Sequence, residues 1–340
     1  MGCLFRILTR VFLLVAAFAV VLGVAMYFSP RPGALIIRTV FERGTRDAEQ
    51  QIASLDPNDV TTLTDIPYRD GDGDALLNVS YPDGAQDGEV LPTVVWIHGG
   101  AWVSGSKDDY GVYHRLIAAE GFTVVSIGYS LAPESSYPTP LLQINQAFRY
   151  LQDHAAEYHI DVDRFVLAGD SAGAQIGSQV AAIITHPDYA AGIGIAPTLA
   201  PEQVRGVILY CGIFDIPAMI DGASVGPRIL RLGARTVIWA YTGSKDSDSA
   251  AATEMSTINA VTADFPATFI GAGNDDPLTN DQSVPMAETL DDLGVPVTTV
   301  FFDEDHEPKQ GHEFQFRVDT EDGQATFETM IDWLDETTSS

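Results

Sequence analysis

Lysine and cysteine are scarce in this chain of 340 residues, and their scarcity excludes several kinds of protein. Three lysines and 15 arginines face 47 acidic residues, which gives a formal net charge of −29. A surface of this sign repels nucleic acid, whose binding requires basic patches, and it disfavours anionic substrates. The two cysteines, Cys3 and Cys211, are too few for a disulfide framework. The histidines lack metal-ligand spacing. We therefore predict no nucleic-acid partner, no metal site and no cofactor.

The few basic residues are concentrated at the N-terminus. Residues 1–46 contain six arginines and one acidic residue, which leaves 12 basic and 46 acidic residues, a net charge of −34, in residues 47–340. Within this basic region, the 18 residues from Val11 to Phe28 carry no charge. Their number is borderline for a membrane span and large for the apolar core of a signal peptide.

We predict that residues 1–32 form a signal anchor, which holds an exported domain, residues 33–340, on a membrane. A signal peptide cleaved after Ala25 is the alternative, and its product would be secreted or periplasmic. The positive-inside rule argues against export, because four arginines follow the apolar segment closely and only two precede it. Large domains can translocate despite this bias, so export is kept as the prediction.

The rest of the chain alternates between short apolar runs and helical stretches. Such alternation predicts a mostly parallel sheet covered by helices on both faces, and the first two runs predict an antiparallel pair. The segment between Cys211 and Ala267 is too long for a simple crossover, so residues 213–262 are predicted to form a small helical cap insertion. The expected strands are 60–67, 75–81, 91–97, 122–128, 165–169, 204–211, 267–272 and 296–302.

Ser171 lies in the most informative motif of the chain. The strand-like run 165–168 leads into Gly-Asp-Ser-Ala-Gly, residues 169–173, and a helical stretch follows. This is the context of a nucleophile elbow, a tight strand-to-helix turn that exposes a serine hydroxyl. The two glycines would leave room for neighbouring backbone. A serine that merely caps the following helix is the alternative.

A second motif follows an upstream strand and favours the nucleophile. The run 91–97 leads into His-Gly-Gly-Ala-Trp, residues 98–102. Acyl transfer requires backbone N–H donors aimed at the oxygen that becomes negative in the transition state. Two consecutive glycines can turn their amides into a cleft without interference from side chains. Gly99 and Gly100, together with the amide of Ala172, are therefore the predicted oxyanion hole.

These two motifs, with Tyr-Ser-Leu-Ala-Pro at 129–133, resemble those of the hormone-sensitive-lipase-like esterases and their carboxylesterase relatives. The resemblance extends from about Val90 to the C-terminus. It implies an α/β-hydrolase fold and hydrolysis of a neutral small-molecule carboxylic ester through an acyl-enzyme. The family's third glycine is Ala101 here, whose amide can still donate. A serine peptidase on the same fold and a non-catalytic binding module are the alternatives.

The resemblance also indicates an acid and a histidine, which follow the serine in that order. Asp276 precedes Pro-Leu, as the family's acid does, and Asp275 is the alternative. His312 matches the family's His-x-Phe pattern, whereas His306 lies in an acidic run and reads as a surface residue. The predicted catalytic triad is Ser171, Asp276 and His312. The other histidines outside the glycine motif are predicted to be surface or helix-capping residues: His114, His154, His159 and His186.

Overall fold

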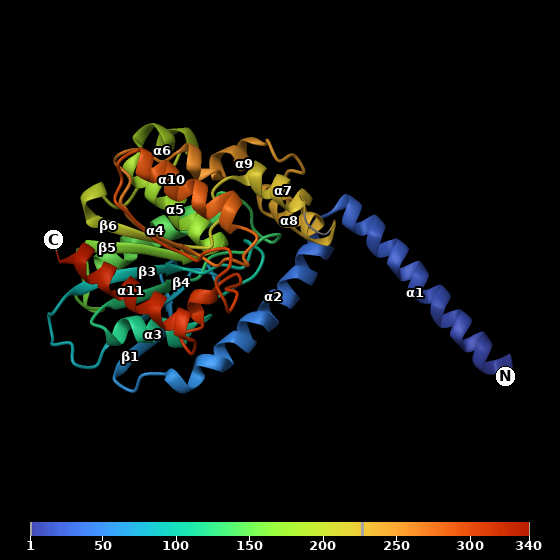
Figure 1. Ribbon diagram of the computed structural model, residues 1–340, viewed down its shortest axis with the longest axis horizontal. Helices are drawn as coiled ribbons and strands as arrows, with labels where there is room; N and C mark the ends of the chain where they lie inside the picture. The colour runs from blue at the N-terminus through green and yellow to red at the C-terminus, as the bar shows by residue number, and fades with distance from the viewer. Residues whose placement is uncertain (1, 226–227, 340) are drawn as a thin grey trace.

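The structure, a computed structural model, describes residues 2–225 and 228–339. Residues 226 and 227 of the predicted insertion 213–262, Met1 of the predicted N-terminal segment, and Ser340 lie outside the described residues. In the described part, eight strands form one sheet (Figure 1). The strands are β1 (Val60–Pro67), β2 (Leu76–Pro82), β3 (Leu91–Ile97), β4 (Thr123–Ile127), β5 (Ile160–Asp170), β6 (Val204–Tyr210), β7 (Ala267–Ala272) and β8 (Val297–Phe301).

The sheet has the predicted mostly parallel arrangement. Its strand order is β1-β2-β4-β3-β5-β6-β7-β8. β2 pairs antiparallel with β1 and with β4, and every pairing from β4 to β8 is parallel. The strand ends differ from the expected ones by at most one residue, except that β5 begins at Ile160. This early start occurs because Ile160 pairs with Leu91 ahead of the main register.

Helices cover both faces of the sheet, α3 and α11 on one face and α4, α5 and α10 on the other (Figure 1). Side chains of a strand alternate between faces. In β3, Val94 and Trp96 accordingly pack toward α3 and α11, and Val95 and Ile97 toward α4 and α5. The helices are α1 (Gly2–Phe28), α2 (Arg31–Ile52), α3 (Gly111–Ala119), α4 (Thr139–Asp153), α5 (Ala172–Thr185), α6 (Pro187–Ile193), α7 (Ile216–Val225), α8 (Arg228–Thr242), α9 (Ala250–Met255), α10 (Val284–Asp292) and α11 (Glu321–Thr338).

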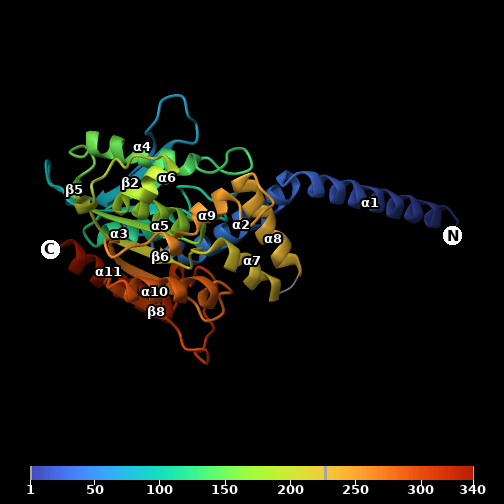
Figure 2. The same cartoon turned by 90° about the horizontal axis from the view of Figure 1, so that it is seen from above.

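The N-terminal helix α1 projects away from the rest of the molecule (Figures 1 and 2). Residues Phe5–Phe28 of this helix are long and apolar enough to cross a membrane, and none of their most apolar window is buried. The following helix, α2, turns back along the body of the protein. Helix α1 is therefore apolar and exposed, whereas α2 packs along the body of the protein.

Helices α7, α8 and α9, which fall within the predicted insertion, lie together at the end of the molecule where α1 leaves it (Figure 2). Their side chains join the same core as α4 and α5, through buried residues such as Ile220, Ile238 and Met255. The N-terminal part of α2 packs closely beside α8. At Gly33 the two helices are so close that an added Cβ would come within 2.8 Å of the Thr236 Cγ2 atom. This contact between α2 and α8 is not expected from the sequence.

Candidate active site

Ser171 lies at the apex of the turn between β5 and α5. Its backbone has φ 51° and ψ −118°, a combination that costs a non-glycine residue energy and that clusters at functional sites. The Ser171 amide donates a 2.8 Å hydrogen bond to the Tyr210 carbonyl oxygen at the end of β6. The neighbouring strand therefore holds this strained turn in place.

The two glycines of the motif are required by close contacts between backbones. A Cβ at Gly173 would overlap the carbonyl oxygen of Ile97 at the end of β3, and its next contact would be the His98 carbonyl oxygen at 2.6 Å. A Cβ at Gly169 would lie 2.6 Å from the Gly173 carbonyl carbon. The start of α5 is thus pressed against β3, which explains the Gly-x-Ser-x-Gly spacing and brings Ser171 beside residues 98–102.

A continuous chain of hydrogen bonds joins Ser171, His312 and Asp276. The distance from His312 Nε2 to Ser171 Oγ is 3.0 Å, and the distance from His312 Nδ1 to Asp276 Oδ2 is 2.9 Å. Asp276 follows β7, its side chain is fully buried, and its Oδ1 accepts a 2.9 Å hydrogen bond from the Leu278 amide. The alternative acid, Asp275, is exposed to solvent. The structure therefore brings together the three residues predicted as a triad.

The surroundings of His312 determine its proton affinity. Burial by itself would lower the pKa of His312, but the hydrogen bond that Nδ1 donates to Asp276 and the negative charges of Asp276 and Glu313 outweigh it and raise the pKa to about 9. The other candidate, His306, lies outside this chain, with Nε2 2.9 Å from Asp322 Oδ2 on α11. His306 is half-buried rather than fully on the surface.

The residues predicted to form the oxyanion hole lie at the end of β3 and at the start of α5. Gly100 has φ 101°, a conformation natural to glycine, and a Cβ there would lie 2.5 Å from the Ser104 carbonyl carbon. Ala101, which replaces the family's third glycine, also has a positive φ of 51°. Among the described residues, no protein group accepts a hydrogen bond from the amides of Gly99, Gly100 or Ala172. These three N–H groups are therefore available to a ligand.

Asp170, the residue before Ser171, is a buried carboxyl group that the sequence analysis did not single out. Burial, followed by the nearby charge of Glu313, holds the pKa of Asp170 well above its usual range. Its Oδ1 accepts a 2.9 Å hydrogen bond from the indole nitrogen of Trp96. Asp170 also occupies the space beside Gly99, where a Cβ would meet its backbone oxygen at 2.8 Å. The Asp170 residue thus packs directly against the glycine loop at Gly99.

Two further histidines are buried near this loop. The ring of His98 stacks on Tyr129, with centroids 4.2 Å apart, and the Tyr129 hydroxyl donates to the His98 carbonyl oxygen at 2.7 Å. Burial lowers the pKa of His98 to about 4 and that of His114 to about 3, so both are neutral. His114 packs against Trp96, so its prediction as a surface or capping residue is wrong, because α3 turns this side chain toward the sheet.

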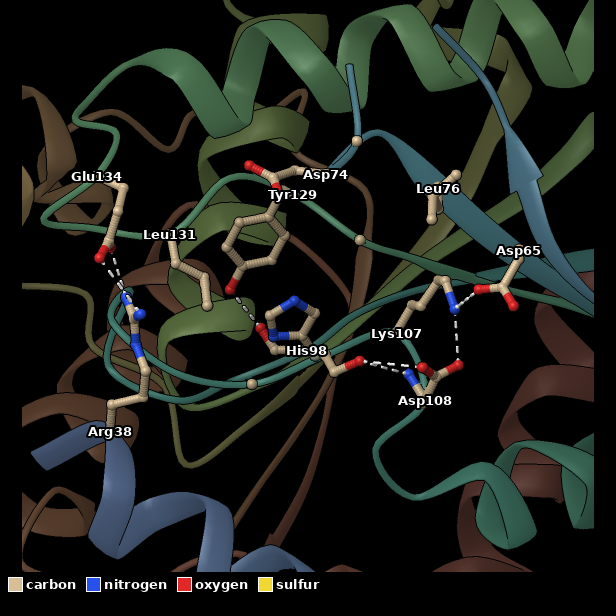
Figure 3. Close-up of a pocket in the computed structure, with 14 residues that line it drawn as sticks. Arg38, Asp65, Asp74, Leu76, His98, Lys107, Asp108, Tyr129, Leu131 and Glu134 are labelled. Carbon is tan, nitrogen blue, oxygen red and sulfur yellow. Dashed lines mark hydrogen bonds and ion pairs between the residues drawn. The ribbon is translucent and has the colours of Figure 1, made fainter. Parts of the chain in front are cut away.

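A polar cavity of about 420 Å³ lies behind this loop and does not include Ser171. His98 and Tyr129 line it together with two cationic side chains (Figure 3). Lys107 makes ion pairs of 2.7 Å with both Asp65 and Asp108. Arg38, from α2, pairs with Glu134 and donates to the carbonyl oxygens of Val103 and Ala132. Both cationic side chains of the cavity are thus already paired with protein groups, and these contacts hold the loop in position.

The sheet, the strained serine and the hydrogen-bonded histidine and aspartate define an α/β hydrolase. Residues 94–315 match the family described as alpha/beta hydrolase fold. The chain belongs to this family, the hormone-sensitive-lipase-like group that its motifs predict. This membership also confirms the predicted fold class.

Similar proteins are named as esterases. Over 241 residues, 69% of this chain and 68% of the relative, the chain is 31% identical to the carboxylesterase NlhH of Mycobacterium tuberculosis. Over 249 residues, 71% of each protein, it is 27% identical to an acetyl esterase of Salmonella paratyphi B. Esterase B of Lactobacillus rhamnosis shares the fold, with a TM-score of 0.79 and 22% identity over 91% of this chain and 96% of that one.

Proposed function

We propose that this protein is a serine carboxylic-ester hydrolase in which Ser171 is the nucleophile, His312 the general base and Asp276 the acid. The observation that carries this proposal is the chain of hydrogen bonds of 3.0 Å and 2.9 Å that joins the three side chains. The strained φ of Ser171 adds support, since strain of this kind persists where function requires it. The relatives named carboxylesterase and acetyl esterase support the reaction class.

The reaction proceeds through an acyl-enzyme. Ser171 Oγ attacks the ester carbonyl carbon while His312 Nε2 takes the hydroxyl proton, and the carbonyl oxygen becomes negative. The amides of Gly99, Gly100 and Ala172 stabilise this oxyanion. His312 then donates its proton to the departing alcohol. A water molecule, activated by His312, attacks the acyl group and releases the acid, which restores Ser171.

Asp276 acts through His312. Its Oδ2 atom lies 2.9 Å from Nδ1, so it selects the tautomer whose Nε2 can accept the serine proton. It also stabilises the imidazolium that forms in the transition state. Because its side chain is fully buried, solvent does not weaken this interaction.

The substrate we propose is a neutral ester with a small or medium acyl group. The net charge of −29 and the carboxylates of Glu313 and Asp276 around the histidine disfavour an anionic ester. The stacked rings of Trp102 and Tyr241, 5.4 Å apart, are fully buried and attach α8 to the segment directly after the glycine loop. Helices α7, α8 and α9 would form the cap over this site.

A serine-reactive fluorophosphonate probe, followed by paired ester and peptide substrates, tests the proposal. We expect the probe to label Ser171 and the protein to hydrolyse a short acyl ester but not the matched peptide. Cleavage of the peptide at a comparable rate would instead support a serine peptidase on this fold. Absence of both labelling and hydrolysis would indicate a binding module.

The location we propose is a membrane surface. Residues 1–32 form a signal anchor and residues 33–340 an exported catalytic domain. The exposed apolar residues of α1 support this, because burial in lipid is favourable by about 25 cal/mol per Å² of apolar surface. Cleavage near Ala25, with release of a secreted or periplasmic enzyme, is the alternative.

A further inference from the structure

Helix α8 has two groups of apolar side chains, one buried in the protein core and one exposed to solvent. Val237, Ile238 and Tyr241, in its C-terminal half, are buried. The exposed group consists of Ile229, Leu230 and Leu232 near its beginning, with exposed fractions of 71%, 52% and 57%. Scattered single exposed apolar residues need no explanation, but a cluster of this kind marks an interaction site.

This exposed cluster belongs to the helix beside which α1 leaves the body of the protein (Figures 1 and 2). Lys245, just after α8, donates a hydrogen bond to the carbonyl oxygen of Tyr27 near the end of α1. The Lys245 ammonium also lies 4.7 Å from the centroid of the Tyr27 ring and 4.2 Å from that of Trp239 on α8. These contacts attach the C-terminal end of α1 to α8.

Helix α2, which packs beside α8, continues the same apolar character. Its side chains Leu35, Ile36 and Val40 are exposed and lie in the first three turns of α2, which begins at Arg31, three residues after α1 ends. A helix that displays these residues to water beside a membrane helix has an unburied apolar face at the level where the chain would enter the lipid. These exposed side chains of α8 and α2, together with the neighbouring arginines of the same two helices, are called the basic apolar face. Its apolar members are Ile229, Leu230, Leu232, Leu35, Ile36 and Val40.

Unpaired arginines accompany these side chains. Arg228, Arg231 and Arg235 lie on α8, and Arg31 and Arg43 lie on α2. Among the described residues, none of the five makes an ion pair. Helix α8 carries no acidic residue, and the acidic residues of α2 lie in its second half, although the protein as a whole has a net charge of −29. In so acidic a protein, a local surplus of arginines beside exposed leucine and isoleucine matches an anionic lipid surface, which attracts basic residues and accepts apolar ones.

We propose that the basic apolar face docks on the surface of an anionic phospholipid bilayer. The apolar side chains enter the interface between headgroups and acyl chains, and the arginines bind lipid phosphates. This inference rests on the proposed anchoring by α1, which keeps the face next to the bilayer. Docking adds a fixed orientation, which the anchor alone would not impose.

The orientation has a direct connection to the candidate active site. Tyr241, in the C-terminal half of α8, stacks on Trp102 with ring planes 6° apart, and Trp102 follows the predicted oxyanion loop. The docked α8 therefore lies between the bilayer and this loop. An ester dissolved in the bilayer would meet α8 first.

A fluorescent probe on the full-length protein tests the docking. Cys3 is replaced by serine, and Cys211 is fully buried, so a cysteine introduced as Leu230→Cys carries an environment-sensitive dye such as a nitrobenzoxadiazole. Val90→Cys is the matched control, because Val90 is 43% exposed and directly precedes β3, at the end of the strand opposite the glycine loop. Both proteins are bound to vesicles of phosphatidylcholine and phosphatidylglycerol, with and without nitroxide-labelled lipid, and vesicle binding is measured by flotation.

We expect both proteins to float with the vesicles and only the dye at position 230 to shift its emission to the blue and to be quenched by the nitroxide. If both float and the dye at position 230 behaves like the dye at position 90, the docking is refuted while the anchor stands. If neither protein floats, the anchor fails, and the docking that depends on it fails as well. Ester hydrolysis in solution, measured separately, tests the catalytic proposal independently.

A charge variant tests the lipid phosphates as the partner. Replacement of Arg228, Arg231 and Arg235 by glutamine should weaken docking on the order of 10²-fold, since each basic residue near an anionic surface contributes roughly fivefold. The quenching at position 230 should then be largely lost, although flotation persists. Full quenching in this variant, or equal quenching of the original protein on pure phosphatidylcholine, would overturn the role of anionic headgroups.

Discussion

The Glu313 carboxylate lies beside the imidazole of His312, with Oε1 3.9 Å from Nε2, the nitrogen that faces Ser171. The Tyr110 hydroxyl holds this carboxylate through a 2.9 Å hydrogen bond, and the Glu313 backbone is left-handed, with φ 61°. The hydrogen bond from Tyr110 and the backbone conformation of Glu313 together fix the position of the carboxylate. A negative charge there favours the imidazolium, which is the form that cannot act as a general base.

The pKa of His312 predicts alkaline activity. In the proposed mechanism neutral His312 is the reactive form. Its pKa is raised to about 9, so kcat/KM for a neutral ester should increase with pH through this region and decrease below it. Glu313→Gln should move the midpoint of the profile down toward the ordinary value of 6.5. Glu202→Gln, at an exposed glutamate directly before β6, is the control. An unchanged midpoint in Glu313→Gln would exclude Glu313 as a cause.

Removal of the nucleophile should abolish hydrolysis and leave the fold intact. Ser171→Ala is expected to reduce kcat/KM by about 10⁴-fold or more and to abolish fluorophosphonate labelling. Ser136→Ala, at an exposed serine, should behave as the original protein. Circular dichroism checks the fold. Activity within tenfold of the original protein would exclude Ser171 as the nucleophile.

The two histidines and the two aspartates should respond differently. His312→Ala should approach the loss seen for Ser171→Ala, because triad members act as a unit, while His306→Ala should remain near the original activity. Asp276→Asn should be far more damaging than Asp275→Asn. Steady-state kinetics on one ester measures all four variants. Damage from His306→Ala or Asp275→Asn instead would reassign the residue and keep the mechanism.

Two glycines of α5 offer a matched pair. Gly173→Ala should destabilise the protein by roughly 1–3 kcal/mol and remove activity, since the new Cβ would overlap backbone at the end of β3. Gly177→Ala should be neutral or stabilise by up to about 1 kcal/mol, because the nearest atom to its Cβ is Ile97 Cδ1 at 3.7 Å. Urea unfolding compares the two. Equal stability would contradict the contact between α5 and β3.

The N-terminal segment should determine location and not catalysis. A chain that begins at Pro32 is expected to be soluble and to keep full activity on a short water-soluble ester. The full-length protein should fractionate with membranes and resist extraction by high salt, because salt screens charge but strengthens apolar burial. Salt extraction of protein that retains Met1 would contradict the anchor. A mature N-terminus near Met26 would establish the cleaved signal.

Much of the fold and the candidate site could be predicted because the relevant patterns are local. The eight strands are apolar runs between turns, and the β5–Ser171–α5 turn is encoded by adjacent residues. The choice of Asp276 and His312 came from a family resemblance and not from local physics. Their neighbours, Asp275 and His306, have the same chemistry, and only the packing of loops after β7 and β8 distinguishes them.

The features that sequence reasoning missed depend on contacts between distant segments. Glu313 affects His312 through space, and its position is set by Tyr110, 203 residues earlier. Asp170 stood within the recognised motif, yet its burial beside Trp96 could not be read from the motif. His114 was expected near the surface because its place on α3 does not reveal which side of the helix faces the sheet.

The predicted triad joins parts of the chain that lie far apart in the sequence. Ser171 and His312 are 141 residues apart, and contacts of such separation form slowly because loop closure costs entropy. β8 pairs with β7 and β7 with β6, so β8 is connected to the sheet through β7. In refolding, ester hydrolysis is therefore expected to return after the helical signal. On the ribosome, a chain shorter than 312 residues would contain Ser171 without its proposed base, so we expect the serine to be unreactive until residue 312 has been added and has folded.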